Sequence, residues 1–230
     1  MAARRCALIF LCVQEEVNMT AIRQPGPINP HTTLIDIGML GVYGITGVYL
    51  IRGKRTCLID AGTRTEAPRL VKELKALDAF PPDVVIITHP HYDHAQGLPT
   101  LRREAERVNK SIEVLASREA LAPLSDPNFN RVFKRGPYVS ISDVKPVGEG
   151  DALDLGGVIL RFYDVPGHCF GHLAILDETG RNVFVGDAIG DKLADDLFMP
   201  PFMPPAWDAA AFLSSIDKLK RLDYDTLCLA

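Results

Sequence analysis

A histidine-rich segment that directly follows an apolar run limits the folds open to this chain. The apolar run Val-Val-Ile-Ile lies within residues 83–88 and is typical of a strand buried on both faces. It is followed by four metal-capable side chains within six positions, His89, His91, Asp93 and His94. Residues two apart at a strand end point the same way, so we expect His89 and His91 to face one point and the other two to face a second point nearby. Zn²⁺ and Fe²⁺ accept imidazole and carboxylate ligands, so the segment predicts a metal centre at the end of a strand.

Two later segments carry similar chemistry. Residues 166–172 read Pro-Gly-His-Cys-Phe-Gly-His and follow an apolar run, and Asp187 follows another at residues 182–185. Loops at strand ends are where layered α/β folds build their sites, so we expect His168 and Asp187 to converge on the first histidine segment. The neighbouring His172 is more typical of a packing or hydrogen-bonding histidine. Cys169 is more typical of a buried bystander than of a nucleophile.

The remaining pattern alternates strands with helices. Period-two or continuous apolar runs predict strands at residues 33–37, 47–51, 56–60, 83–88, 158–165, 173–176, 182–185 and 226–229. Helical spacing predicts helices at residues 65–77, 99–108 and 209–222, with a weaker one at 126–133, in a stretch of many turn-forming residues. This mixture favours an α/β or α+β layered architecture.

Four motifs in this order resemble the metallo-β-lactamase superfamily of metallohydrolases. They are Leu-Ile-Asp-Ala-Gly at residues 58–62, Thr-His-Pro-His-Tyr-Asp-His at 88–94, Val-Pro-Gly-His at 165–168 and Val-Gly-Asp at 185–187. The H-x-H-x-D-H element is highly specific, and the resemblance spans about residues 33–230. It implies a four-layer αββα sandwich with a dinuclear metal centre at one edge of its two sheets.

The resemblance also implies roles for individual residues. The first metal would be held by His89, His91 and His168, the second by Asp93 and His94, and both by the bridging carboxylate of Asp187, with Asp60 supporting the histidine loop. Family members usually supply a last histidine shortly after a strand like Thr226–Leu229, whereas this sequence stops at Ala230. We therefore expect either a domain that lacks its C-terminal end or an incomplete second site. The expected cofactor is two zinc ions, with iron and manganese as alternatives that the ligand types do not separate.

These features predict a hydrolase, with similarity to glyoxalase II-like enzymes. A metal-bound hydroxide would attack an ester, thioester, lactone or similar acyl substrate, with Asp93 as the catalytic carboxylate. A proline-rich segment at residues 197–207 contains apolar side chains ten residues beyond Asp187. We expect it to form either a substrate lid or an arm packed on the core or on a second subunit. The expected substrate contacts are Tyr92, Phe198, Met199, Phe202 and Trp207.

Two other functions stay open. One is a mononuclear iron, sulfur-dioxygenase-like oxidoreductase, in which one iron is held by two histidines and one aspartate, so that a missing final histidine would matter less. The other is a non-catalytic metal-binding module, against which the intact H-x-H-x-D-H set argues. Metal analysis combined with an oxygen-uptake assay on a persulfide separates the two enzyme classes.

Charge and cysteine content narrow the partners and the compartment. With 25 basic against 29 acidic residues, the net charge is −4, so the chain lacks the basic character of a nucleic-acid binder. Five cysteines, odd in number and without C-x-x-C spacing, favour a reducing, cytoplasmic location. We expect residues 1–18 to be an N-terminal extension with Met19 as an alternative start, and residues 19–230 to form a single domain. The apolar run at residues 6–13 is too short to span a membrane, and we expect a small-molecule substrate, with a homo-oligomer left open.

Overall fold

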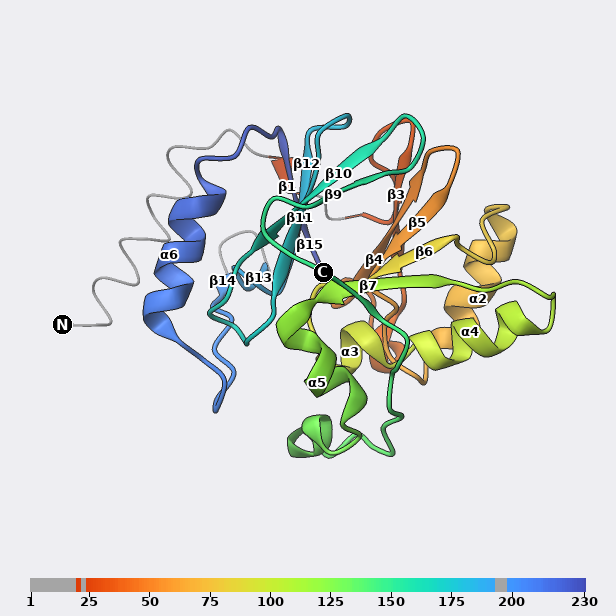
Figure 1. Ribbon diagram of the computed structural model, residues 1–230, viewed down its shortest axis with the longest axis horizontal. Helices are drawn as coiled ribbons and strands as arrows, with labels where there is room; N and C mark the ends of the chain where they lie inside the picture. The colour runs from red at the N-terminus through yellow and green to blue at the C-terminus, as the bar shows by residue number, and fades with distance from the viewer. Residues whose placement is uncertain (1–19, 22–23, 193–197) are drawn as a thin grey trace.

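The computed structural model describes residues 20–21, 24–192 and 198–230, and two β-sheets lie face to face at its centre (Figure 1). The expected extension at residues 1–18, the start at Met19 and the side chains of Cys6, Cys12 and Leu197 lie outside the described residues. The first sheet has the strand order β2-β3-β4-β5-β6-β7-β8, and the second has the order β1-β15-β12-β11-β10-β9. The first sheet consists of β2 (Gly26–Pro27), β3 (Thr32–Asp36), β4 (Gly47–Arg52), β5 (Thr56–Ile59), β6 (Val84–Ile86), β7 (Glu113–Ser117) and β8 (Lys145–Val147). The second consists of β1 (Thr20–Ala21), β9 (Ala152–Asp154), β10 (Ile159–Asp164), β11 (Leu173–Asp177), β12 (Asn182–Gly186) and β15 (Thr226–Leu229).

Helices cover the outer face of each sheet. Those next to the first sheet are α2 (Ala67–Ala76), α3 (Tyr92–Ala95), α4 (Leu98–Glu106) and α5 (Leu121–Ser125), and α6 (Ala209–Leu219) lies on the second. Short 3-10 turns occupy Met39–Gly41, Arg118–Ala120 and Phe129–Phe133, and β13 (Asp191–Lys192) pairs with β14 (Phe198–Met199). The helix α6 begins where the Asp208 carboxylate accepts hydrogen bonds from the backbone N–H groups of Ala210 and Ala211.

Alternation along the strands divides the apolar side chains among three cores. On β4, Leu50 packs toward α2 and α4, while its neighbour Ile51 packs into the space between the sheets. The core between the sheets joins residues of both, such as Ile86 and Phe184, and a third core packs α6 against the second sheet. Three cores separate four layers, so the expected αββα sandwich is confirmed.

The expected elements agree with the structure most closely where the hydrophobic period is strong. The expected helix at residues 65–77 is α2, the one at 99–108 is α4, and the one at 209–222 is α6. The weakly expected helix at 126–133 is a 3-10 turn at Phe129–Phe133, and α5 precedes it without having been expected. The strands β7, β8 and β9 were also missed. Strands β8 and β9 are three residues long, whereas β7 carries a buried Val-Leu-Ala run that was an available signal.

Two further expectations concern cysteines and membranes. Of the five cysteines, Cys57, Cys169 and Cys228 are described, and all three are buried and outside any disulfide. Among the described residues, no helix has the length and apolar character needed to cross a membrane.

Candidate metal centre

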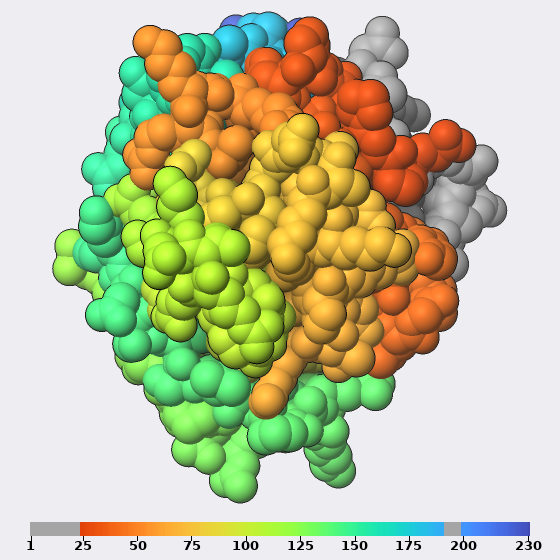
Figure 2. Space-filling model, turned by 90° about the vertical axis from the view of Figure 1, so that its right-hand side faces the viewer, coloured from red at the N-terminus to blue at the C-terminus, as the bar shows by residue number. Residues whose placement is uncertain are grey.

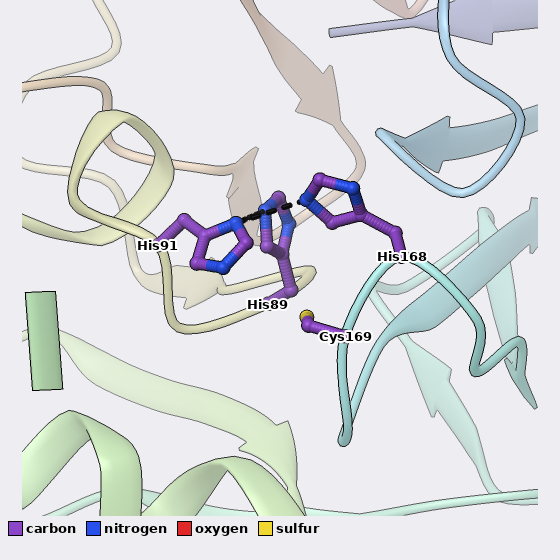
Figure 3. Close-up of side chains that lie close together, drawn as sticks. All are labelled: His89, His91, His168 and Cys169. Atoms are coloured by element: carbon purple, nitrogen blue, oxygen red, sulfur yellow. Dashed lines mark hydrogen bonds between the residues drawn. The ribbon is translucent and has the colours of Figure 1, made fainter. Parts of the chain in front are cut away.

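Three histidine rings from two distant loops meet at one edge of the sandwich. His89 and His91 lie in the loop between β6 and α3, and His168 lies in the loop between β10 and β11. The Nδ1 atom of His91 is 3.0 Å from Nε2 of His89 and 2.9 Å from Nε2 of His168. Figure 3 shows the three rings turned toward one another, with these nitrogen atoms at the point where they converge. All three side chains are buried.

The hydrogen-bond partners of the outer nitrogen atoms show that this donor set fits a metal ion. The Thr88 hydroxyl donates to Asp60 and therefore accepts from Nδ1–H of His89, 3.1 Å away. Nδ1–H of His168 donates to the Pro201 carbonyl oxygen. Both arrangements leave a lone pair on Nε2, and a single N–H of His91 cannot serve two such lone pairs well. A metal ion can bind the lone pairs of all three ring nitrogens. Tetrahedral zinc holds its nitrogen ligands about 3.3 Å apart, which is close to the separations found here.

The electrostatic environment keeps the first two rings neutral. Burial, together with the charges that the neighbouring histidines would carry, holds the pKa of His89 well below its ordinary value. Burial and His168 lower the pKa of His91 to about 3. Because metal ligation requires the unprotonated ring, both histidines are ready to bind a metal at neutral pH.

Asp187, at the end of β12, lies between the three converging histidines and His94. Its Oδ2 atom is 3.4 Å from Nε2 of His168 and 3.6 Å from Nε2 of His89, while its Oδ1 atom is 3.2 Å from Nε2 of His94. One oxygen atom of this carboxylate therefore faces the nitrogen atoms of His89 and His168, and the other faces that of His94, as a bridging ligand would.

His94 is oriented by Asp60 from the opposite side. The Asp60 carboxylate accepts from Nδ1–H of His94 at 2.8 Å and also from the backbone N–H and the hydroxyl of Thr88. Burial opposes a charge on His94, but Asp187 and Asp60 outweigh it and raise the pKa of His94 well above its ordinary value. Burial likewise opposes the charge on Asp187, and the adjacent His94 outweighs it and lowers the pKa of that carboxyl.

Two other polar residues of these loops have different surroundings. Asp93 lies on α3 beside His94 and belongs to neither set of converging donor atoms; burial is the main cause that raises its pKa, and Asp187 adds to it. His172 stacks on His89 with 4.5 Å between ring centroids. Its Nδ1–H donates to the Leu173 carbonyl, and its Nε2 accepts from the backbone N–H of Asp187. His172 is therefore a hydrogen-bonding histidine, as expected.

Cys169 lies beneath the first set. Its Sγ atom is within 4.8 Å of one nitrogen atom of each of the three rings, and burial raises the pKa of its thiol. In Figure 3 the sulfur lies apart from the point at which the ring nitrogens converge. The buried thiol is therefore protonated at neutral pH and is poorly suited to act as a nucleophile.

Within its described residues, the proline-rich segment meets the candidate metal centre through a backbone hydrogen bond. Its contact there is the Pro201 carbonyl, which accepts from His168 at 3.0 Å. Met199 and Phe202 are exposed, and Trp207 packs on Phe212 with 5.0 Å between ring centroids. The backbone of Phe198 is in β14, and its side chain lies outside the described residues.

A different segment, which sequence reasoning did not select, covers the histidine loop. We call residues 126–139 the cover segment; it projects below the two sheets in Figure 1 and forms the lower end of the face in Figure 2. Its Phe133 ring lies 5.2 Å from the ring of His91 and 5.3 Å from that of Tyr92, measured between centroids. Aromatic residues in a polar stretch were the available signal, and the many turn-forming residues around them concealed it.

A cavity of about 490 Å³ opens between the cover segment, Tyr92 and the loop before α2. Its walls include Arg64, Glu66, Gln96, Arg135 and Tyr138. Of the five substrate contacts expected from the sequence, Tyr92 lines this cavity, whereas Met199, Phe202 and Trp207 do not.

Comparison with known proteins identifies relatives of this chain. The family model of the metallo-beta-lactamase superfamily matches residues 43–230. A hydroxyacylglutathione hydrolase of Ruegeria pomeroyi is 33% identical over 135 residues, which cover 59% of this chain and 43% of that protein. An acyl-coenzyme A thioesterase of Gallus gallus is 29% identical over 159 residues, which cover 62% of this chain and 57% of the relative. The chain thus spans about half the length of these curated relatives.

Solved structures show the same fold at low sequence identity. A subclass B3 metallo-beta-lactamase from a soil metagenome library has a TM-score of 0.69 at 23% identity, with 90% of this chain and 79% of that chain covered. A protein solved in a di-iron-bound form has a TM-score of 0.64 at 22% identity, with 90% and 91% covered.

Proposed function

The chain belongs to the metallo-β-lactamase superfamily, and from this membership and the geometry of the histidine loops we propose that it is a metal-dependent hydrolase of acyl thioesters. The observation that carries the proposal is the Asp187 carboxylate, whose Oδ2 atom faces the Nε2 atoms of His89 and His168 and whose Oδ1 atom faces Nε2 of His94. The names of the curated relatives, a hydroxyacylglutathione hydrolase and an acyl-coenzyme A thioesterase, favour the thioester among the acyl substrates.

In this proposal, His89, His91 and His168 would hold a first metal ion, His94 and Asp93 would hold a second, and Asp187 would be a ligand of both. A divalent ion at this place would supply a bound water with a pKa of about 7 and would polarise the carbonyl group of the substrate. Zinc is the proposed metal, and iron and manganese suit the same ligand types.

The protein's own groups orient the ligands and move the proton. Asp60 and the Pro201 carbonyl each accept an N–H from a ligand histidine, which fixes the ring and leaves its Nε2 free. The Asp93 carboxylate accepts the proton of the attacking water. Its pKa, raised mainly by burial, lies closer to neutral than that of a free aspartate, which suits a proton acceptor.

The test is hydrolysis of a hydroxyacylglutathione and of acetyl-coenzyme A by the purified protein, before and after its metal is removed with a chelator. We expect activity that disappears with the metal and returns when zinc is added back. The substitution His91→Ala should lower kcat/KM by more than the roughly 10–100-fold that the loss of an outer partner of a ligand costs. Phe170→Ala is the matched control, since this side chain is 67% exposed in the second histidine loop and should be replaceable without loss. Full thioester hydrolysis by His91→Ala would refute the proposal.

A further inference from the structure

One residue of the cavity wall is the sequence neighbour of a proposed metal ligand. Tyr92 lines the cavity and directly follows His91 in the chain. The rings of His91, Phe133, Tyr92 and Tyr138 form a continuous aromatic row, with 5.2, 5.3 and 6.0 Å between successive centroids. This row joins the ring of a proposed metal ligand to two tyrosines of the cavity wall, so the cavity lies next to the histidine loop. A volume of about 490 Å³ is within the range of small-molecule sites.

Hydrogen bonds hold the segments of the cavity wall together. The Asn130 amide donates to the Pro90 carbonyl at 3.0 Å, between the two histidines of the loop. The buried Gln96 side chain makes two hydrogen bonds to the backbone of Val139, one in each direction. Arg64 donates to the Pro137 carbonyl at 3.3 Å. The cover segment is thus tied to the histidine loop, to the residues after α3 and to the loop before α2.

Two positive charges line this cavity without a carboxylate partner within the described part of the chain. Some other arginines of the protein pair with acidic side chains, namely Arg55 with Glu113, Arg161 with Glu178, and Arg181 with Asp223 and Asp225. Arg64 donates to a backbone carbonyl, as Arg52 and Arg102 do elsewhere in the protein, and Arg135 forms no ion pair among the described residues.

The one acidic residue of the cavity wall is already engaged. The Glu66 carboxylate accepts from the Thr63 hydroxyl and from the backbone N–H of Leu40, which places it in the loop structure. With two arginines against one glutamate, the wall is net positive in a protein whose net charge is −4. Lys134 adds another exposed cation on the cover segment.

We infer that this cavity binds the thiol-carrier half of the substrate and that Arg64 and Arg135 bind anionic groups on that carrier. The guanidinium fork suits both carboxylates and phosphates, and Tyr92 and Tyr138 supply flat surfaces for the rest of the carrier. The carrier is therefore a thiol bearing carboxylates or phosphates. The inference rests on the proposed thioester hydrolysis, because the carrier is defined by the bond that is cleaved.

The first experiment measures steady-state kinetics of the metal-loaded protein and of the variants Arg64→Ala and Arg135→Ala. Three acyl thioesters are compared: a hydroxyacylglutathione, which carries carboxylates; acetyl-coenzyme A, which carries phosphates; and the neutral acetyl thioester of N-acetylcysteamine. Each variant should raise KM about tenfold for an anionic thioester with kcat changed by less than about twofold, because only binding of the non-reacting part is lost. The neutral thioester should be unaffected. Arg103→Ala, a change of a 57% exposed arginine on α4 outside the cavity, is the control.

The second experiment measures binding without turnover. S-methylglutathione and S-methyl-coenzyme A are thioethers, so calorimetry with the metal-loaded protein reports their affinity independently of hydrolysis. We expect at least one thioether to bind about tenfold more weakly to each arginine variant than to the wild type. The thioether that responds identifies whether the anionic groups are carboxylates or phosphates.

The outcomes separate this inference from the proposed function. Thioester hydrolysis by the wild type with unchanged KM and thioether affinity in both arginine variants would overturn the inference and leave the proposed function intact. An arginine-dependent thioether affinity in a protein that hydrolyses none of the three thioesters would refute the proposed function while supporting the cavity as an anionic-ligand site. An equal rise in KM for the neutral thioester would also overturn the inference, because the arginines would then act on the fold of the cover segment.

Discussion

The Nδ1 atom of His168 lies 3.0 Å from the carbonyl oxygen of Pro201, so the proline-rich segment reaches the metal centre through its backbone. The bond assigns the ring proton to Nδ1 and leaves Nε2 free to face Asp187. The exposed side chains of Met199 and Phe202 take no part in this contact. The segment therefore acts as an outer support for His168, a proposed metal ligand.

Shortening this segment should weaken metal binding. A variant lacking residues 200–204 loses the carbonyl that orients His168, and the loss of such an outer partner typically lowers metal affinity about 10–100-fold. Competition with a chromophoric zinc chelator measures the change. Phe202→Ala keeps the backbone path and should bind zinc as the wild type does. If the shortened protein also binds zinc normally, the contact with Pro201 is dispensable.

Asp60→Asn should lower metal affinity with little damage to the backbone. Asp60 has a φ of 63°, a left-handed conformation that asparagine tolerates as well as aspartate does. The substitution keeps the shape but removes the charge that supports His94 and the acceptor shared with Thr88. We expect a roughly 10–100-fold loss of zinc affinity with unchanged far-ultraviolet circular dichroism. Unaltered affinity would show that Asp60 does not tune the ligand.

The regular spacing of apolar residues in the sequence was sufficient to predict most helices and central strands of the fold. Helices α2, α4 and α6 and most central strands follow from local apolar spacing, which survives in the fold because each element buries one face in one core. The proximity of His89, His91, His168 and Asp187 was predicted because each follows a strand, and the strand ends meet at one edge.

The remaining parts of the site depend on contacts between segments distant in the chain. Nothing local in Pro201 indicates that its carbonyl faces His168, 33 positions away. The cover segment has no helical period, and it is held by side-chain bonds such as that of Asn130 to Pro90. Such contacts depend on the tertiary arrangement, so spacing along the sequence did not indicate that residues 126–139 lie against the histidine loop.

Metal stoichiometry should separate the two proposed sites. The wild-type protein should take up about two equivalents of zinc, since the proposed ligands form two sites that share Asp187. His94→Ala removes the nitrogen that faces Oδ1 of Asp187 and should retain about one equivalent, held by the other group. Calorimetric titration, with metal content measured after dialysis, gives the count. The control is His172→Gln, which keeps an acceptor for the Asp187 N–H and should still bind two equivalents. Two equivalents in His94→Ala would show that His94 is not a ligand.

Gly97→Ala should destabilise the fold at the point where the residues after α3 pack against residues 60–62. A Cβ atom at Gly97 would lie 1.9 Å from the Ala61 carbonyl oxygen, a backbone atom that cannot rotate away. The same contact region holds the hydrogen bonds from Ala61 N–H to the His94 carbonyl and from Gly97 N–H to the Gly62 carbonyl, at 2.7 and 2.8 Å. We expect the free energy of unfolding in urea to fall by about 1–3 kcal/mol or more, and zinc affinity to fall with it because α3 carries His94.

The control is a glycine with open space around it. A Cβ atom at Gly148 would meet only the Asp164 side chain, at 3.9 Å, which is ordinary contact. Gly148→Ala should therefore change the free energy of unfolding by no more than about 0.5 kcal/mol. Equal stability of the two variants would mean that the chain at Gly97 can move away from Ala61 without a loss of free energy. The close approach of these two residues would then not be what holds His94 against Asp60.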